Sequence, residues 1–353
     1  MDQPRTVTAP EELRAELPAD AATTARVGRW RGRIEDVLAG RDDRVLAVVG
    51  PCSVHDLTAT RRYAARLRDL ADELSGELLV VLRSFFEKPR STVGWTGLFT
   101  DPALDGGSDV ERGMRSARRL LLDVAELGLP AATEWVSPFA PAYLADLVGY
   151  GTIGARTVES QPHRQLAAAL PMPVGMKNGT TGSLRAAVDA VVAARHPHGF
   201  LGIGPRGSVA WTSATGNPGA HVVLRGGVSG PNYDAISVHR LLRRLRTAGL
   251  PEAVVIDASH GNSGKDHARQ PGVVGDIGAQ LASGNRAIRG VMVESFLVPG
   301  RQDVLPGRAL TEGQSITDSC LGWDDTAELL RRLAAAVRAR RRTGDLVDWL
   351  ALA

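Results

Sequence analysis

The sequence predicts a (β/α)8 barrel, in which eight parallel strands alternate with eight helices. The first observation is a repeated order along residues 45–345, where a short apolar run precedes a segment with helical periodicity. The second is that the connections between most of these units are short. The third is that no GxGxxG-type motif follows the first strand. Its absence disfavours the runner-up fold, an open doubly wound sheet.

The first predicted strand is a continuous apolar run that ends in Gly-Pro, as expected for a strand buried on both faces. The expected strands cover residues 45–51, 77–84, 129–136, 151–160, 172–179, 221–227, 253–262 and 288–298. Between them, apolar residues recur three and four positions apart, which is the spacing of one helical face. The expected helices cover residues 58–74, 110–128, 140–150, 161–170, 183–195, 235–249, 272–284 and 326–342.

Two segments lie outside this repeat. Residues 1–44 are predicted to form an N-terminal extension with one or two helices, the last of which ends at Gly40. We expect this extension to contact a neighbouring subunit. Residues 199–219 place two short strands around Gly and Pro turns, which predicts an inserted β-hairpin before the sixth barrel strand. The rest of the chain, 45–345, is predicted to be one catalytic barrel.

The composition is that of a globular protein without a membrane span. Of 353 residues, 43% are hydrophobic and 23% are charged, and the net charge of +3 comes from dispersed residues. We therefore expect neither a nucleic-acid surface nor a membrane segment. The N-terminus is polar, unlike a signal peptide, and the chain has only two cysteines, Cys52 and Cys320. These features predict a cytoplasmic protein without a disulfide framework.

Lysine is rare in this chain. Only three of the 42 basic residues are lysines, namely Lys88, Lys177 and Lys265. Each follows an apolar run and has Gly, Ser or Pro nearby. A lysine that persists where the chain otherwise uses arginine is expected to require a compact ammonium group.

Every predicted strand has a chargeable or metal-binding side chain at or just after its C-terminal end. In strand order these residues are Cys52, Arg83, Glu134, Arg156, Lys177, Arg225, His260 and Glu294. Charged side chains are almost never buried without a partner, so packing alone does not explain this pattern. The chemistry of (β/α)8 barrels takes place at this end of the strands. The sequence therefore predicts a charged site at the barrel mouth.

Six of the mouth residues are cations: Arg83, Lys88, Arg90, Arg156, Lys177 and Arg225. Lys88 and Arg90 come from the loop after the second strand, which alone could be a solvated charged turn. Together the six would repel one another unless anions bind there. We therefore predict at least one bound phosphate group, and expect two.

Three of the other mouth residues, with Asp318 from a later loop, form a mixed sulfur, nitrogen and oxygen donor set. The set is Cys52, His260, Glu294 and Asp318. Such donors suit a divalent transition metal such as Mn, Fe, Co or Zn. Taken alone, Cys52 is more often a small core residue and His260 an ordinary polar histidine. Their shared position at strand ends favours the metal interpretation.

Four further residues receive structural interpretations. We expect His55 to pair with Asp56 in a loop, and His163 and His267 to lie at the surface. Cys320 is expected to line the mouth without binding metal. The run of arginines at 338–342 is interpreted as a solvated helix end, where cations are favoured.

Nine segments, in order, resemble the class I 3-deoxy-D-arabino-heptulosonate 7-phosphate (DAHP) synthases of the microbial, feedback-sensitive type. The resemblance extends from about Arg41 to Trp323. The segments are GPCSVHD, LRSFFEKPRSTVGW, AATE, GARTVESQPHR, KNGTTGSL, TGNPGAHVVLRGG, IDASHGNSGK, GVMVESFLV and GQSITDSCLGW.

The resemblance implies the first step of the shikimate pathway, in which phosphoenolpyruvate and erythrose 4-phosphate give DAHP and phosphate. It implies metal ligands at Cys52, His260, Glu294 and Asp318. It implies phosphoenolpyruvate contacts at Arg83, Glu134, Gly154, Ala155, Arg156, Lys177 and Arg225. It implies erythrose 4-phosphate contacts at Lys88, Pro89, Arg90, Ser91 and Asp318. Lys177, expected among arginines, is then a candidate proton donor or acceptor, and Cys52, His260 and Asp318 serve catalysis through the metal.

The chain departs from the family pattern at several positions. Ser91 replaces the usual Thr, and Phe296 stands where many members have His. Residues 135–142, WVSPFAPA, differ from the usual loop, which with the 199–219 hairpin forms the effector region of feedback-regulated members. Gly202 stands where Gly usually accompanies Tyr or Trp sensitivity. The resemblance therefore implies an aromatic amino acid as effector, with inhibition altered or absent here.

Three other functions are alternatives to this reaction. One is a sister enzyme that condenses phosphoenolpyruvate with a different aldose phosphate, such as a 3-deoxy-octulosonate 8-phosphate synthase. The others are a regulatory paralogue without activity and a metal aldolase without phosphoenolpyruvate. The retained KPR segment and the extra cations favour the DAHP reaction. The resemblance also implies a homodimer or homotetramer.

Overall fold

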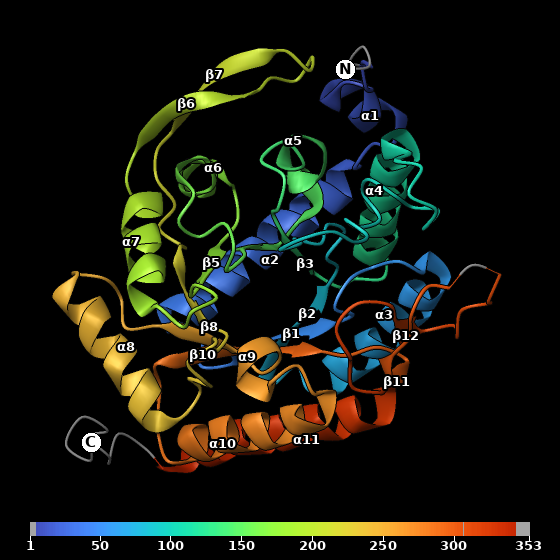
Figure 1. Ribbon diagram of the computed structural model, residues 1–353. Helices are drawn as coiled ribbons and strands as arrows, with labels where there is room; N and C mark the ends of the chain where they lie inside the picture. Colours follow the sequence, from blue (N-terminus) through green and yellow to red (C-terminus); the bar gives the residue numbers. More distant parts are fainter. Residues whose placement is uncertain (1–4, 306, 344–353) are drawn as a thin grey trace.

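The computed structural model describes residues 5–305 and 307–343. In this range eight parallel strands close into a barrel in the order β1-β10-β9-β8-β5-β4-β3-β2 (Figure 1). The strands are β1 (Val45–Gly50), β2 (Leu78–Arg83), β3 (Ala131–Glu134), β4 (Tyr150–Ile153), β5 (Val174–Lys177), β8 (His221–Leu224), β9 (Val254–Asp257) and β10 (Ile288–Glu294). The closed barrel confirms the predicted fold and excludes an open sheet.

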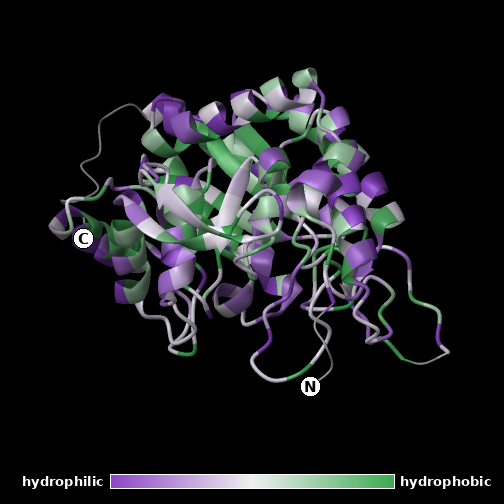
Figure 2. Cartoon of the chain, turned by 90° about the horizontal axis from the view of Figure 1, so that it is seen from above, coloured by the Kyte–Doolittle hydropathy of each residue, from purple (hydrophilic) through white to green (hydrophobic). Residues whose placement is uncertain are grey.

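Helices follow the strands and surround the barrel. They are α3 (Leu57–Glu73), α4 (Val110–Glu126), α5 (Pro141–Leu144) with the 3₁₀ helix η1 (Ala145–Leu147), α6 (Gln161–Ala169), α7 (Leu184–Arg195), α8 (Ala235–Thr247), α10 (Gln270–Ala282) and α11 (Trp323–Thr343). Asp56, Asp109 and Asp234 cap three of them by accepting a backbone N–H. Hydrophobic colour is concentrated in the interior, whereas the outer helices alternate between hydrophilic and hydrophobic residues (Figure 2).

The inward faces of the strands change from apolar to charged toward their C-terminal ends. Alternate residues of a strand point to the same face. On β2 this face carries Leu79, Val81 and then Arg83, and on β10 it carries Met292 and then Glu294. Leu79, Val81 and Met292 belong to the apolar cluster that fills the barrel. The period of two therefore brings a charged residue into the barrel one layer above this filling.

Helix α2 (Ala21–Ala39) packs against the barrel filling. Its Ile34, Val37 and Leu38 join the cluster inside the barrel. The Asp20 side chain accepts the Thr23 N–H at its start. It ends at Gly40, whose φ of 77° is left-handed, as predicted from the sequence. A subunit contact by the N-terminal extension stays a prediction.

The inserted hairpin is present as β6 (His198–Ile203) and β7 (Val209–Ala214), paired antiparallel before β8. It extends away from the barrel toward helix α1 (Pro10–Glu16) (Figure 1). The Glu11 N–H donates to the Pro205 carbonyl in the hairpin turn, at 2.9 Å. The hairpin and the N-terminal extension are therefore in direct contact.

The structure differs from the predicted elements most clearly in four regions. The strand expected at residues 151–160 ends at Ile153, and the strand expected at 253–262 ends at Asp257 and is followed by the short helix α9 (His260–Ser263). The helix expected at residues 140–150 stops at Leu147, and Tyr150 already belongs to β4, because the Gly149 N–H bonds to the Ala131 carbonyl of β3. The last barrel strand ends at Glu294 rather than at residue 298. The residues beyond it form a small parallel sheet of β11 (Val298–Arg301) and β12 (Gln314–Ser315).

No helix in the described ranges is long and apolar enough to cross a membrane.

Candidate active site

A cavity of about 170 Å³ lies at the C-terminal end of the barrel. All six cations predicted for the mouth line it, and Lys265 joins them. The six are Arg83, Lys88, Arg90, Arg156, Lys177 and Arg225. Every lysine of the chain therefore faces one cavity. Such a density of positive charge suits ligands with phosphate groups.

Lys177, at the end of β5, lies between two carboxylates. Its Nζ is 2.8 Å from Glu134 Oε2 and 3.5 Å from Asp257 Oδ2. It also lies 5.2 Å from the centre of the Phe85 ring. Burial would raise the pKa of Glu134, but Lys177 and then Arg83 lower it to about 2. The immediate partners of Lys177 are thus carboxylates rather than the arginines expected from the sequence.

Arg83, at the end of β2, is 1% exposed. Its Nη2 lies 2.9 Å from Glu294 Oε1, and its guanidinium donates to the carbonyls of Pro51 and Cys52. The guanidinium stacks over the Phe85 ring at 3.6 Å from the centroid. Its Nη1 is buried without a hydrogen-bond partner among the described residues. A buried donor of this kind is available to an anionic ligand oxygen.

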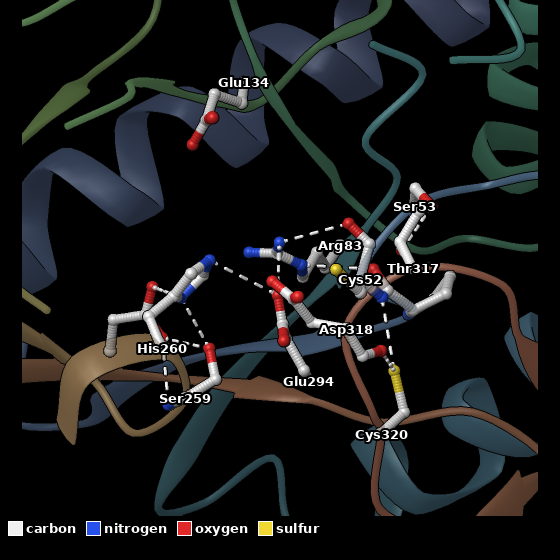
Figure 3. Close-up of polar contacts among 12 residues, drawn as sticks. Cys52, Ser53, Arg83, Glu134, Ser259, His260, Glu294, Thr317, Asp318 and Cys320 are labelled. Atoms are coloured by element: carbon white, nitrogen blue, oxygen red, sulfur yellow. Dashed lines mark hydrogen bonds and ion pairs between the residues drawn. The ribbon is translucent and has the colours of Figure 1, made fainter. Parts of the chain in front are cut away.

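Three of the four predicted metal ligands converge beside Arg83 (Figure 3). Ligand atoms of Cys52, Glu294 and Asp318 all lie within 4.8 Å of one another. Lys88 Nζ is 2.6 Å from Cys52 Sγ and 3.8 Å from Asp318 Oδ2. Burial would raise the pKa of Asp318, but Lys88, His260 and Lys265 lower it to about 2. Asp318 is therefore ionised at neutral pH, as a ligand must be.

His260, the fourth predicted ligand, stands beside this set. Its Nε2 points toward Glu294 Oε1 at 3.6 Å (Figure 3). On the other side of the ring, Nδ1 lies 3.0 Å from Asp257 Oδ2 and 2.8 Å from Ser259 Oγ. In histidines that bind metals, a carboxylate usually lies beside the second ring nitrogen, and Asp257 occupies that position here. His260 also has a left-handed φ of 54°, which is uncommon outside glycine and frequent at functional sites.

The donor set therefore fits a divalent transition metal. It combines a thiol, an imidazole and two carboxylates at one edge of the charged cavity. Burial raises the pKa of the Cys52 thiol, and Glu294 adds to this, whereas Lys88 lowers it. A bound cation would favour the thiolate, so metal binding should release a proton.

The segment that follows β2 carries two further cations of the cavity, Lys88 and Arg90. Its backbone is held by a bond from the Lys88 N–H to the Thr96 carbonyl, at 2.9 Å. Arg90 Nε donates to the Trp95 carbonyl at 2.7 Å. Arg156 Nε donates to Ser91 Oγ at 2.9 Å, which links this segment to the loop after β4. The loop after β2 and the loop after β4 are therefore in contact beside the cavity.

Two glycines allow backbone to approach the site closely. A Cβ at Gly154 would lie 2.7 Å from Glu134 Oε1, so a side chain there would have to displace this carboxylate. Gly226, after β8, has a left-handed φ of 67°, and a Cβ there would lie 2.4 Å from the Gly261 carbonyl carbon. Ala155 and Arg225, next to these glycines, line the cavity.

Sequence reasoning missed four residues that belong to this site. Asp257 Oδ2 lies 3.5 Å from Lys177 Nζ and 3.0 Å from His260 Nδ1, whereas the sequence predicts only a strand position for it. Phe85, Glu87 and Lys265 line the cavity. The rarity of lysine was the signal for Lys265, whose Nζ is 3.3 Å from Asp318 Oδ1.

The expectation of a surface position for His163 is wrong. The side chain is 8% exposed, and both ring nitrogens have hydrogen-bond partners. Cys320 lies next to the site, where its Sγ accepts the Cys52 N–H at 3.4 Å.

Comparisons with known proteins identify the family. The model of the "DAHP synthetase I family" matches residues 16–331. A Phe-sensitive phospho-2-dehydro-3-deoxyheptonate aldolase of Escherichia coli is 49% identical over 94% of this chain and 95% of its own length. A Tyr-sensitive one of Salmonella typhimurium is 48% identical over 92% of this chain and 91% of its own length.

The chain belongs to the DAHP synthetase I family. The solved structure of a phospho-2-dehydro-3-deoxyheptonate aldolase from Francisella tularensis is similar throughout. Its TM-score is 0.95 at 43% identity, and the match covers 97% of this chain and 99% of that chain. The family is metal-dependent, in agreement with the converging side chains of Cys52, Glu294 and Asp318.

Proposed function

We propose that this chain condenses phosphoenolpyruvate with erythrose 4-phosphate to give DAHP and phosphate, the first step of the shikimate pathway. The observation that carries the proposal is a single cavity lined by seven cations, His260 and Asp318. The thiol of Cys52 and the carboxylate of Glu294 lie beside Asp318 at its edge. Membership of the DAHP synthetase I family supports the same reaction. Two phosphorylated substrates account for the excess of positive charge.

The strand-end side of the cavity binds phosphoenolpyruvate. Arg83 and Lys177 are fixed at strand ends, and the Arg83 Nη1 donor is available to a carboxylate or phosphate oxygen. The full set of contacts is Arg83, Glu134, Gly154, Ala155, Arg156, Lys177 and Arg225. The loop side binds erythrose 4-phosphate through Lys88, Pro89, Arg90 and Ser91, with Asp318 near its aldehyde.

Cys52, His260, Glu294 and Asp318 would hold a divalent Mn, Co, Fe or Zn ion. When bound, the ion would supply Lewis-acid polarisation of the aldehyde. Asp257 orients His260 through Nδ1 and so directs Nε2 toward the other ligands. The side chains alone do not select among these metals, because such a donor set accepts several.

The cations perform the positioning that the reaction requires. They bring two anions that repel each other into one cavity, so that C3 of phosphoenolpyruvate can approach the aldehyde carbon. A new C–C bond forms, water adds at C2, and cleavage of the C–O bond releases phosphate. Lys177 would hold or move a proton near C2. Its contact with Glu134 at 2.8 Å supplies a path for that proton.

A panel of aldehydes tests the substrate assignment. Purified protein is given phosphoenolpyruvate with erythrose 4-phosphate, arabinose 5-phosphate or no aldehyde, with and without a chelator, and released phosphate is measured. We expect rapid release only with erythrose 4-phosphate and metal. Equal release with arabinose 5-phosphate would favour a sister condensing enzyme, and release without any aldehyde would contradict a condensation.

Regulation and assembly are further parts of the proposal. The two relatives named above are called Phe-sensitive and Tyr-sensitive. Because loop 135–142 departs from the family pattern, we expect weak or no inhibition of this chain by aromatic amino acids. A steady-state assay with Phe, Tyr and Trp tests this, and strong inhibition by Phe would contradict it. We also expect a cytoplasmic protein that forms a homodimer or homotetramer. Light scattering measures the mass of the assembly and so tests the oligomeric state.

A further inference from the structure

A buried carboxylate precedes the segment that binds the aldose phosphate. Glu87 is 7% exposed and lines the cavity next to Lys88. Its two oxygens accept hydrogen bonds from backbone N–H groups, and in the described part of the chain they pair with no cation. Nothing in the proposed reaction uses this carboxylate directly. A carboxylate without a cation is costly to bury, so its position requires an explanation.

The partners of Glu87 are consecutive residues of another loop. The Ser137 N–H donates to Oε1 at 3.1 Å and the Val136 N–H donates to Oε2 at 3.4 Å. Both lie in the loop between β3 and α5. From the opposite side, His163 Nε2 of α6 is 2.9 Å from the Val136 carbonyl, and its Nδ1 is 2.9 Å from Ser160 Oγ. Val136 is therefore held through both its N–H and its carbonyl.

The backbone at Glu87 leaves little freedom to absorb a shift of this loop. Gly97 packs against it with a φ of 115°, and a Cβ there would lie 2.6 Å from Glu87 Cα and 2.2 Å from the Phe86 carbonyl oxygen. The next N–H, that of Lys88, is bonded to the Thr96 carbonyl. A displacement of the Glu87 side chain should therefore also move the neighbouring residue, Lys88. The Nζ of Lys88 lies 2.6 Å from Cys52 Sγ.

We propose that Glu87 is a positioning residue for the aldose phosphate, because it fixes the Lys88–Ser91 segment to the β3–α5 loop. The β3–α5 loop then determines where residues 88–91 contact the substrate, although the loop itself does not contact the substrate. This inference rests on the proposed function, since it assigns the second substrate to Lys88–Ser91. The contact uses backbone N–H groups of the loop, so it does not depend on the loop's side chains.

Two simpler roles of Glu87 predict different results. If the carboxylate acted only as a negative charge near a phosphate, its removal would reduce repulsion and lower the KM for erythrose 4-phosphate. If it served only to satisfy two N–H groups, its removal would cost stability without distinguishing the substrates. A positioning residue predicts a higher KM for erythrose 4-phosphate alone.

The substitution Glu87→Gln tests the proposal, because it preserves volume but supplies only one acceptor oxygen. We expect the KM for erythrose 4-phosphate to rise roughly 5- to 20-fold, since a hydrogen bond to a charged group is worth about 1.5–3 kcal/mol and part of that is retained. The KM for phosphoenolpyruvate and the thermal midpoint should stay close to those of the wild type. Glu159→Gln, which neutralises an exposed carboxylate on another loop, is the matched control and should leave both KM values unchanged.

A second variant approaches the same peptide from its other side. His163→Asn removes the bond to the Val136 carbonyl, and it should also raise the KM for erythrose 4-phosphate. The double variant should show less than the product of the two single effects, because both act on one peptide. If the two effects on the KM for erythrose 4-phosphate multiplied fully, the two residues would not act through the same peptide.

The pH profile separates positioning from simple structural support. Burial raises the pKa of Glu87 to about 7, and Glu134 of β3 adds repulsion. His163 lies across the peptide from it. As the pH rises past neutrality the carboxylate ionises and accepts both N–H groups, so the wild-type KM for erythrose 4-phosphate should fall relative to that of Glu87→Gln.

The inference is overturned if Glu87→Gln leaves this KM within about twofold of the wild type or lowers it. It is also overturned if both KM values rise together with a loss of thermal stability. If instead the wild type does not consume erythrose 4-phosphate, the proposed function has failed before the role of Glu87 is tested.

Discussion

The two sides of the cavity are built differently. On the strand-end side, Arg83 is 1% and Lys177 is 3% exposed, and both are ion-paired with buried carboxylates at the ends of other strands. On the loop side, Arg90 and Ser91 are exposed. Among the described residues, the Arg90 side chain hydrogen-bonds only to a backbone carbonyl, and the Ser91 side chain only to Arg156.

This difference indicates two ways of binding a phosphorylated substrate. The strand-end side is organised before any ligand arrives, because its charges already satisfy one another inside the barrel. On the loop side Lys88 is already held against Cys52. The exposed side chains of Arg90 and Ser91 have few partners, so the substrate phosphate must order them. We therefore expect changes on the strand-end side to affect stability and turnover, and changes on the loop side to affect mainly the KM for erythrose 4-phosphate.

The largest effect is expected from Cys52→Ala. Removal of the thiol should lower kcat by about a thousandfold or more and reduce bound metal, because Lewis-acid polarisation and ligand geometry are lost together. Metal content by mass spectrometry and kcat from phosphate release measure both. Cys320→Ser is the matched control, since this thiol is equally buried and touches the Cys52 N–H. Near-normal metal content in Cys52→Ala would remove Cys52 from the ligand set.

Lys177→Met should destabilise the protein by about 3–5 kcal/mol, because Glu134 and Asp257 would remain buried without their cation. Urea unfolding measures the free energy of unfolding. The double variant with Glu134→Gln should recover part of the stability while activity stays lost. A loss below about 1 kcal/mol in the single variant would show that the strand-end side is not held by these ion pairs.

Acid should weaken the strand-end side first. The pKa of Glu134 is lowered from 4.5 to about 2, so the unfolded chain binds more protons than the folded chain between these values. Stability is therefore fully present above about pH 4.5 and falls as the pH falls toward 2, by up to roughly 3 kcal/mol from this group. Urea unfolding at several acidic pH values should show a shallower fall for Glu134→Gln than for the wild type. Equal slopes would contradict the assignment.

On the loop side, Arg90→Ala should raise the KM for erythrose 4-phosphate about 10- to 100-fold, because a charge-assisted hydrogen bond is lost. The KM for phosphoenolpyruvate should change little, and the free energy of unfolding should stay near that of the wild type. Arg112→Ala, at an exposed position on α4, controls for the removal of positive charge. A parallel rise of both KM values would remove the distinction between the two sides.

The smallest effect is expected at Ser91. Ser91→Ala removes the acceptor of the Arg156 Nε–H and should raise the KM for erythrose 4-phosphate only about 2- to 5-fold. Ser91→Thr, which retains the hydroxyl, should be close to wild type. If the threonine variant had as high a KM for erythrose 4-phosphate as the alanine variant, the hydroxyl would not be the group that lowers this KM.

The sequence was sufficient to predict the barrel and its charged mouth, because both depend on local patterns. An apolar run followed by a charged residue places that residue at a strand end, and the period of two directs Arg83 and Glu294 inward. The end of the helix expected at 140–150 was wrong for a related reason: helical structure stops at Leu147 and β4 begins at Tyr150. A short apolar run is compatible with a buried helix or a strand. Here the hydrogen bond from the Gly149 N–H to the Ala131 carbonyl aligns the chain with β3, so a strand follows.

Contacts made by closure of the barrel could not be predicted in the same way. Asp257 ends an apolar run and resembles any strand terminus, yet β8 separates β9 from β5 and the barrel still brings Asp257 to Lys177. The burial of His163 and the bonds of Glu87 depend on a loop whose path no local pattern indicates. These interactions join residues distant in sequence, so they follow from the fold rather than from a motif.

One diffraction experiment tests the central claim most directly. Crystals grown with Mn²⁺ and phosphoenolpyruvate, without the aldose, are measured at the manganese edge. The account predicts an anomalous peak bounded by Cys52, His260, Glu294 and Asp318, with the phosphoenolpyruvate beside Arg83 and Lys177. A peak elsewhere, or phosphoenolpyruvate bound to Lys88–Ser91 instead, would contradict it.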